Sequence, residues 1–199
     1  MNGRELLRGQ SWRAWQEVIS NHYLQQLIVS ERALQSYFCE RIRYEFSQKQ
    51  RLTRRLLLEP KLKNLASHER FQPDILVCDH EKVIAVIELK YQPNQRPNFE
   101  PDLWKLACIA KDLGRFEVAN NRFRGPRVMQ EPYRVAPNVL YVWAGVYGSE
   151  YIEISTKIDM CIAQQFLALH AVTHVGSLPD VYRSSPSKSG VHVGDLSST

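Results

Sequence analysis

The amino-acid sequence predicts an α/β fold in which one mixed sheet is covered by helices on both faces. Segments with helical periodicity are interspersed with short apolar runs along the chain. The runs at residues 83–91 and 138–146 do not alternate with polar residues, so both faces of these strands are expected to be buried. Hydrophobic residues make up 44% of the 199 residues and charged residues 24%, which is enough apolar material for a packed core.

Two helices are expected in the first part of the chain. From residue 11 to about residue 29, aromatic and aliphatic side chains recur every three or four positions. Ser30 fits the N-cap of a second helix that runs to about residue 46. Glu31 and Glu45 fall on the apolar face of this second helix. A carboxylate in an apolar stripe is costly unless something binds it.

Three strands are expected next, at residues 54–62, 71–79 and 83–91. The polar sequence DHEK forms the turn between the second and the third. The third strand is rich in β-branched residues and has no polar alternation, which predicts a central position in the sheet.

A helix at 101–113, a strand at 138–146 and a helix at 154–172 complete the predicted order. From about residue 176 the chain is rich in Ser, Pro and Gly, which is typical of a tail. We therefore expect a single domain at 1–175, with an N-terminal helical extension, and a C-terminal tail at 176–199.

The most informative polar residues lie at the ends of two predicted strands. Glu88 and Lys90 project from the same face of the central strand, because side chains alternate with a period of two. A turn near residues 80–81 pairs position 74 with 87 or 88, so Asp74 and Glu88 become cross-strand neighbours, with Cβ atoms roughly 4.5–5.5 Å apart. Two such carboxylates repel each other, and a hard divalent cation removes the repulsion. A lysine beside them can hold an attacking water.

Pro73-Asp74, followed after one strand by Glu88-Leu89-Lys90, resembles the signature of the PD-(D/E)XK nucleases. The predicted order of helix, three strands, helix and strand over residues 31–146 is also similar to the core of that family. The resemblance implies a restriction-endonuclease-like core with a mixed sheet of four or more strands. It further implies phosphodiester hydrolysis that depends on Mg²⁺, with Mn²⁺ as a substitute.

The resemblance also implies a role for each residue. Asp74 and Glu88 would hold the metal ion, and Lys90 would assist the water. Many members of the family add a carboxylate from the helix before the first strand. Glu31, which opens the sequence SERALQ after its serine, is the first choice for this third acid, and Glu45 is the second.

Positive charge is concentrated in two segments. Residues 41–63 carry a net charge of +6, whereas the whole chain carries +5. The predicted loop at 115–138 is rich in arginine, with aromatic residues between the arginines, a pattern that suits phosphate contact and base stacking. We expect the two segments to form the walls of a nucleic-acid cleft. The candidate nucleic-acid contacts are Arg54, Arg55, Lys105, Arg122, Arg124 and Arg127.

Other classes of protein are disfavoured. The four cysteines lie far apart without a CxxC pair, which argues against a zinc site or a disulfide framework. His170 and His174 are spaced like metal ligands on a helix, but no third ligand is evident. The chain has no apolar run long enough to span a membrane and no signal peptide, so a soluble cytoplasmic protein without a membrane partner is expected.

The sequence favours a metal-dependent DNA endonuclease that acts in defence against foreign DNA, a role that rests on family analogy. Two alternatives stay open at this point: a non-catalytic nucleic-acid-binding or assembly subunit that keeps the fold, and an RNA-processing nuclease. A chain of this length has little room for a target-recognition domain. A homodimer or a partner subunit is therefore expected to supply specificity.

Overall fold

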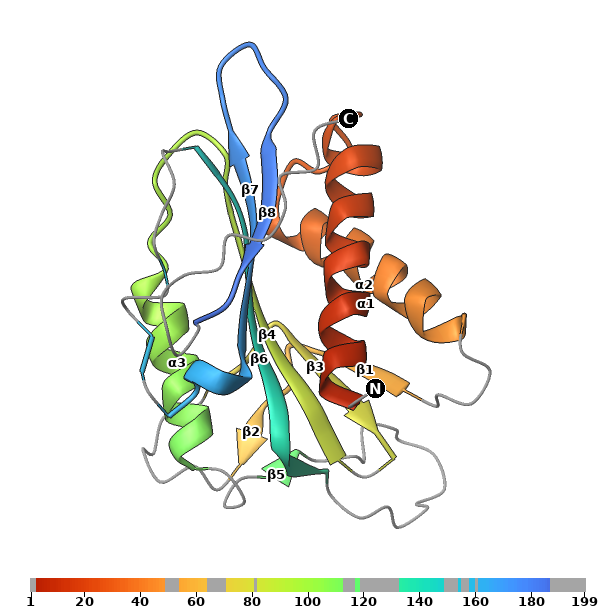
Figure 1. Ribbon diagram of the computed structural model, residues 1–199, viewed down its shortest axis with the longest axis vertical. Coiled ribbons are helices and arrows are strands. Elements are labelled where there is room, and N and C mark those ends of the chain that lie inside the picture. Colours follow the sequence, from red (N-terminus) through yellow and green to blue (C-terminus); the bar gives the residue numbers. More distant parts are fainter. Residues whose placement is uncertain are drawn as a thin grey trace.

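The structure is a computed structural model that describes residues 3–48, 54–63, 71–80, 82–112, 117–118, 133–148, 154, 158–159 and 161–186 (Figure 1). Its centre is a six-stranded sheet in the order β1-β3-β4-β6-β7-β8. The strands are β1 (Arg54–Leu58), β3 (Ile75–Asp79), β4 (Lys82–Gln92), β6 (Arg134–Gly148), β7 (Phe166–Thr173) and β8 (Asp180–Ser184). Two short strands, β2 (Leu62–Lys63) and β5 (Glu117–Val118), pair with each other separately.

The sheet is mixed, as predicted. The pairs β1–β3, β3–β4 and β7–β8 are antiparallel, whereas β4–β6 and β6–β7 are parallel. Strand β4 lies between β3 and β6, so the prediction of a central position is confirmed. Its continuous apolar run is buried on both faces, because helices cover both sides of the sheet.

Helices α1 (Gly3–Glu17) and α2 (Glu31–Ser47) pack on one face of the sheet, and α3 (Glu100–Lys111) packs on the other (Figure 1). Helix α1 continues into a π-helical segment, η1 (Val18–Tyr23). The predicted cap of α2 is confirmed, because the Ser30 side chain accepts a hydrogen bond from the Ala33 amide at 3.1 Å. No helix in the described part of the chain is long and apolar enough to cross a membrane.

The N-terminal helix belongs to the core of the fold. Trp15 is fully buried on the inner side of α1, and its indole Nε1 donates a hydrogen bond to the His170 carbonyl oxygen at 3.1 Å. Leu7 and Ala14 of the same helix are buried with it. The predicted helical extension therefore supplies part of the apolar layer that covers the sheet.

The prediction of a helix at 154–172 was wrong. Residues 166–173 form β7, which pairs in parallel with β6 from Tyr141↔Phe166 to Gly148↔Thr173. The helix described there is a single 3₁₀ turn, η3 (Ala163–Gln165). A short, continuously apolar segment such as FLALHAV is compatible with both a helix and a buried strand. Here it forms a strand because it pairs with the edge of β6.

The expected tail also contains a strand. Residues 180–184 form β8, which pairs with β7 in a hairpin whose connecting loop contains Gly176, with a φ of 77°. Within the described chain the fold therefore extends at least to Ser184. The predicted strand at 54–62 divides into β1 and β2 at Glu59, which has a φ of 45°. Strand β6 begins at Arg134, inside the expected arginine-rich loop.

Two glycines of the fold should respond to substitution in opposite directions. In Gly145→Ala the new methyl group would overlap the Trp143 indole ring, so we expect a loss of about 2 kcal/mol or more of unfolding free energy. In Gly9→Ala the methyl group meets only the end of the Arg13 side chain at 3.4 Å, so helix propensity should dominate and stabilise by about 1 kcal/mol. Thermal unfolding of both variants checks the pair, and equal melting temperatures would contradict the packing described for Trp143.

Candidate functional site

The acidic pair predicted from the sequence comes together at the start of β3. Ile75 of β3 lies opposite Ile87 of β4, which places Asp74 next to Glu88. The Asp74 carboxylate accepts a hydrogen bond from the Leu89 amide at 2.6 Å. The two carboxyl groups are therefore held on adjacent strands, as the predicted hairpin register requires.

The backbone of Asp74 is fixed from two further sides. Gln35 of α2 donates from Nε2 to the Asp74 carbonyl oxygen at 2.9 Å. The Glu59 amide donates to the same oxygen at 2.9 Å. Helix α2 and the residue that follows β1 thus fix the backbone position of Asp74.

Glu88 is almost completely buried, with 1% of its surface exposed, although it carries a carboxyl group. Its Oε2 atom forms an ion pair with Lys105 of α3, whose Nζ atom donates a hydrogen bond to it at 2.7 Å. Its Oε1 atom is buried and has no hydrogen-bond partner among the described residues. Half of this carboxylate is therefore satisfied by the protein, and the other half can bind a further group.

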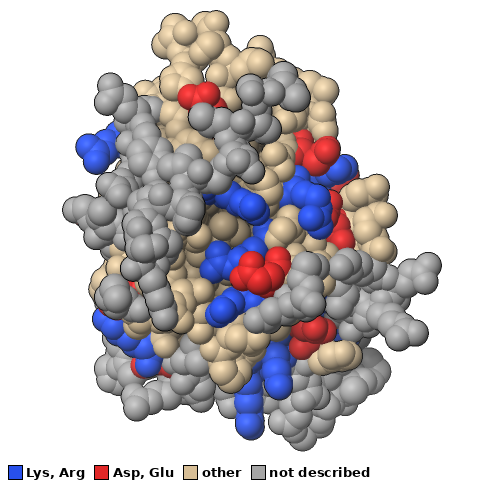
Figure 2. All heavy atoms as spheres, in the orientation of Figure 1, with Lys and Arg blue, Asp and Glu red and all other residues tan. Residues whose placement is uncertain are grey.

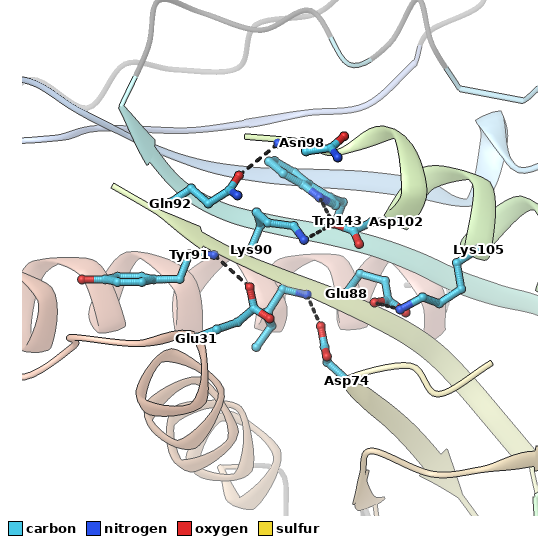
Figure 3. A network of polar contacts seen from close by, with 11 residues as sticks. Glu31, Asp74, Glu88, Lys90, Tyr91, Gln92, Asn98, Asp102, Lys105 and Trp143 are labelled. Carbon is cyan, nitrogen blue, oxygen red and sulfur yellow. Dashed lines mark hydrogen bonds and ion pairs between the residues drawn. The ribbon is translucent and has the colours of Figure 1, made fainter. Parts of the chain in front are cut away.

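Lys90 projects from the same face of β4 as Glu88 and also reaches α3. Its Nζ atom lies 3.2 Å from Asp102 Oδ2, and the Trp143 indole donates to the same oxygen at 3.3 Å. Figure 3 shows Lys90 and Glu88 pointing from β4 toward Asp102 and Lys105 of the helix. The strand and the helix thus form two adjacent ion pairs.

Of the two acids considered on α2, the structure brings Glu31 to this site. Glu31 Oε2 accepts a hydrogen bond from the Tyr91 amide at 3.1 Å (Figure 3). Glu45 instead forms an ion pair with Arg13 of α1 at 2.8 Å. The two side chains therefore have different partners at the two ends of α2.

Six residues form what we call the site cluster, and they come from four separate segments of the chain. They are Glu31, Asp74, Glu88, Lys90, Asp102 and Lys105. With all groups ionised the cluster has an excess of negative charge, because four carboxylates face two ammonium groups. An opening of about 230 Å³ lies beside it, lined by Glu31, Arg32, Gln35, Glu59, Asp74 and Leu89.

Burial raises the pKa of the central carboxyl groups. Burial raises the pKa of Asp74 to about 6, although the Leu89 amide and the charge of Lys105 oppose the rise. Burial, and then the neighbouring Asp74, raises the pKa of Glu88 well above its usual range. Burial alone would lower the pKa of Lys105, but Glu88 and the other carboxylates raise it, so this lysine stays charged. Both acids are thus destabilised as anions, which favours a cation beside them.

The carboxylate oxygens of Asp74 and Glu88 suit a hard divalent ion such as Mg²⁺. The buried Oε1 atom of Glu88 and the desolvated Asp74 carboxyl group offer hard oxygen ligands. The described residues contain no group of three or more His, Cys, Asp or Glu side chains that could hold a metal ion. Mg²⁺ commonly binds through about one or two carboxylates and keeps several waters, so a two-carboxylate site suits it. A closed site made entirely of protein ligands is not formed by this part of the chain.

Several predicted nucleic-acid contacts lie elsewhere or have other partners. Arg54 Nη1 donates to Gln10 of α1, and Arg55 Nη1 donates to the Tyr133 hydroxyl. Arg54 pairs with Asp79, at the end of β3 opposite to Asp74. Lys105 belongs to the site cluster through Glu88. The remaining three predicted contacts, Arg122, Arg124 and Arg127, lie outside the described residues.

The two histidines considered as metal ligands do not lie on a helix. His170 is fully buried in β7, where Nδ1 lies 2.9 Å from the Tyr147 hydroxyl and Nε2 lies 3.0 Å from Ser184 Oγ. His174 lies 2.9 Å from Asp180 at the β7–β8 hairpin. Their ring nitrogens therefore contact protein groups in two different environments.

Sequence reasoning gave no role to three residues that shape the site. Asp102 lies in the predicted helix at 101–113, Gln35 in the sequence SERALQ and Trp143 in the predicted strand at 138–146. A usable signal for Asp102 was its spacing of three from Lys105, which puts both side chains on one face of α3. The partners of Gln35 and Trp143 depend on the tertiary fold.

The chain matches no protein-family model, and neither a curated protein nor a solved structure is significantly similar to it.

The raised pKa of Asp74 predicts how the neutral variant Asp74→Asn should behave. A carboxyl pKa raised by folding means that protonation stabilises the native state. This stabilisation is complete below the ordinary pKa of 3.8 and is lost as the pH rises through about 6. The asparagine is neutral at every pH, so at pH 8 in EDTA it should stabilise the protein by about 2 kcal/mol, or roughly 4–8 °C. The gain should disappear near pH 4.

Asp159→Asn provides the control with the opposite sign. The Cys161 amide and Lys111 lower the pKa of Asp159 to about 2, so ionisation stabilises the native state there. This variant should lose stability at pH 8 rather than gain it. Differential scanning calorimetry at both pH values checks the comparison, and a lower melting temperature for Asp74→Asn at pH 8 would contradict the strained acidic pair.

Proposed function

We propose that this chain is a metal-dependent nuclease with a restriction-endonuclease-like core, and that DNA is its substrate. One observation carries the proposal: two desolvated carboxyl groups, Asp74 and Glu88, lie on adjacent strands with Lys90 two residues beyond Glu88 on the same face. Phosphodiester hydrolysis uses such a pair of desolvated carboxyl groups to hold a metal ion.

The order of elements supports the same proposal. The segment α2-β1-β3-β4-α3-β6 has the order of helix, three strands, helix and strand expected of a PD-(D/E)XK core, with β4 parallel to β6. Asp74 stands at the start of the second of these three strands and Glu88 near the end of the third. Both occupy the positions that the family resemblance assigns to the metal-binding acids.

Each residue of the cluster can be given a chemical role. Asp74 and the Oε1 atom of Glu88 would hold Mg²⁺ or Mn²⁺, which when bound lowers the pKa of water and offsets charge at phosphorus. Lys90 would orient the attacking water or take up developing negative charge through its ammonium group. Asp102 holds that ammonium group in place, and Glu31 adds a further acid at the opening beside Asp74.

A non-catalytic nucleic-acid-binding or assembly subunit is the second candidate, and one observation favours it. Glu88 pairs with Lys105 and Lys90 pairs with Asp102, so each strand residue has an ion-pair partner within the protein. These ion pairs join β4 to α3, which is a structural use of the same residues. The two candidates differ in a direct assay, because only a nuclease cuts its substrate.

The decisive experiment incubates the protein with plasmid DNA, single-stranded DNA and RNA in Mg²⁺, Mn²⁺ or EDTA. The proposal expects cleavage of DNA in either metal and none in EDTA. Asp74→Asn and Glu88→Gln should abolish cleavage, whereas Asp180→Asn, on the β7–β8 hairpin, should cut normally. DNA binding that survives EDTA, without cleavage under any condition, would favour the binding subunit. Cleavage confined to RNA would establish the RNA-processing alternative.

Lys90→Met should separate catalysis from metal binding. If Lys90 acts on the water, its loss should lower the cleavage rate by roughly 10²–10⁴. Mn²⁺ affinity, measured by calorimetry, should persist because both carboxylates remain. Lys82→Met removes an exposed lysine from the other end of the same strand and is the matched control, expected to have normal activity. Loss of Mn²⁺ affinity in Lys90→Met equal to that in Asp74→Asn would show that Lys90 is structural.

A further inference from the structure

A second polar region lies on the opposite side of the sheet, between α1 and β8. It is a cavity of about 420 Å³, within the range of about 300–1,000 Å³ that is usual for ligand sites. Its wall comes from the first turns of α1, the start of β7 and the end of β8. The lining residues are Glu5, Arg8, Gly9, Gln164, Leu167, Arg183, Ser184, Ser185 and Pro186.

This cavity has the opposite charge to the site cluster. Arg8 and Arg183 line it, and Arg4 lies close enough to act on Arg8 electrostatically. Glu5 is the acidic residue in the lining, and 59% of its side chain is exposed. Figure 2 shows basic side chains gathered around one acidic group near the middle of this face, where Figure 1 places α1 beside β8.

Arg8 is held in position before any ligand arrives. Its Nη2 atom donates to the Gln164 carbonyl oxygen at 3.3 Å, and Nε lies 3.5 Å from Glu5. Only 13% of the side chain is exposed, so little conformational freedom remains to be lost on binding. Burial, together with the charges of Arg4 and Arg183, lowers the pKa of this guanidinium, so an added anion relieves local repulsion.

Arg183 lacks an acidic partner within the described chain. Its guanidinium lies 5.7 Å from the centre of the Trp12 ring, and this stacking is the side-chain contact that holds it. An arginine stacked on an aromatic ring keeps its donor atoms at its edge, where they can bind an anion through two hydrogen bonds. Arg183 therefore brings a positive charge to the cavity that the described protein does not neutralise.

Two serines also belong to the lining, Ser184 and Ser185. Ser184 lies opposite Ala168, so its side chain points to the α3 face of the sheet, where Oγ lies 3.0 Å from His170 Nε2. Tyr147 holds the other ring nitrogen of His170 at 2.9 Å, so Ser184 anchors the end of β8 through a buried chain of polar groups. Arg8 and Arg183 are therefore the side chains whose charged donors the cavity offers to an oxyanion.

We propose that the cavity between α1 and β8 binds a phosphomonoester of about mononucleotide size through Arg8 and Arg183. A phosphomonoester carries about −1.5 to −2 charges near pH 7, which matches two guanidinium groups, and its oxygens accept bidentate hydrogen bonds from them. The volume leaves room for a group attached to the phosphate. This proposal does not rest on the nuclease assignment, because no residue of the site cluster lines the cavity.

Calorimetry with the full chain in EDTA tests the proposal. The titrants are inorganic phosphate, a nucleoside 5′-monophosphate, the matching nucleoside, and a short oligonucleotide with or without a 5′-phosphate. If the cavity accepts the phosphate of a free nucleotide and also that of a nucleic-acid end, both the monophosphate and the phosphorylated oligonucleotide should bind. Binding of the monophosphate alone would assign the cavity to a free nucleotide. A nucleoside that binds as tightly as its monophosphate would overturn the proposal.

Three variants locate the binding. Arg8→Gln and Arg183→Gln should each weaken monophosphate binding by about tenfold or more, the usual effect of losing a charge-assisted hydrogen bond. Arg43→Gln removes an equal charge from an exposed position on α2, outside the cavity, and should change the affinity by less than about twofold. Equal weakening in all three variants would show attraction by net charge and overturn the site.

The Arg8 side chain is largely buried, so Arg8→Gln can lose affinity simply because the fold is destabilised. Thermal unfolding of each variant separates this effect from the loss of a phosphate contact. Arg183 is exposed in β8, so Arg183→Gln is expected to keep the wild-type melting temperature while losing affinity. Asp74→Asn should bind the monophosphate normally, since it alters only the site cluster. No measurable binding of the monophosphate by the wild-type chain would overturn the proposal and leave the nuclease test unaffected.

Discussion

The structure depends on keeping one carboxyl group, Glu88, inside the buried face of its central strand. A carboxylate without a partner at such a position would cost several kcal/mol or would take up a proton. Lys105 opposes this by reaching from α3 to within 2.7 Å of Glu88. The helix can supply that lysine only because Leu106 and Ile109 of the same helix pack in the apolar layer over the sheet.

The same constraint explains the charge pattern on both elements. Strand β4 presents Glu and Lys two residues apart, which is about 6.6 Å along a strand. Helix α3 presents Asp102 and Lys105 three residues apart, a rise of about 4.5 Å along the helix, also with the acid before the lysine. Because the helix runs back across the strand, each residue meets its opposite charge. Once the apolar contacts place α3, the two ion pairs fix its register on the sheet.

The sequence allowed most of the fold to be predicted wherever local signals and tertiary partners agree. Ser30 capped its helix, and the apolar run at 83–91 became the central strand. The helix at 154–172 failed because apolar residues there satisfy a helical period and a buried strand equally well. Strand β8 was missed because an edge strand of five residues with Ser, Arg and Asp in it has the composition of a tail. In both cases the neighbouring strand supplies the deciding hydrogen bonds, and the sequence of the segment does not contain that information.

The site was predictable to the extent that strand register determines it. A two-residue period and a short hairpin were enough to bring Asp74 and Glu88 together. The partners on α3 were not predictable, because they depend on how a helix 12 residues long rotates and slides on the sheet. The positions of the basic residues of β1 were not predictable for a related reason. Arg54 and Arg55 begin their strand at the end of the sheet away from Asp74, where protein groups accept their hydrogen bonds.

The two polar regions of the molecule arise from the same sheet by opposite means. On the α3 face an acid is buried inside a strand, and Lys105 of the helix compensates its charge. On the α1 face two arginines are gathered at an edge, where the end of β8 and the first turns of α1 leave a cavity. An excess of carboxylates favours cations, and an excess of guanidinium groups favours anions, so the two regions do not compete for one ligand. Since no residue belongs to both, a loss of function in one region leaves the chemistry of the other intact.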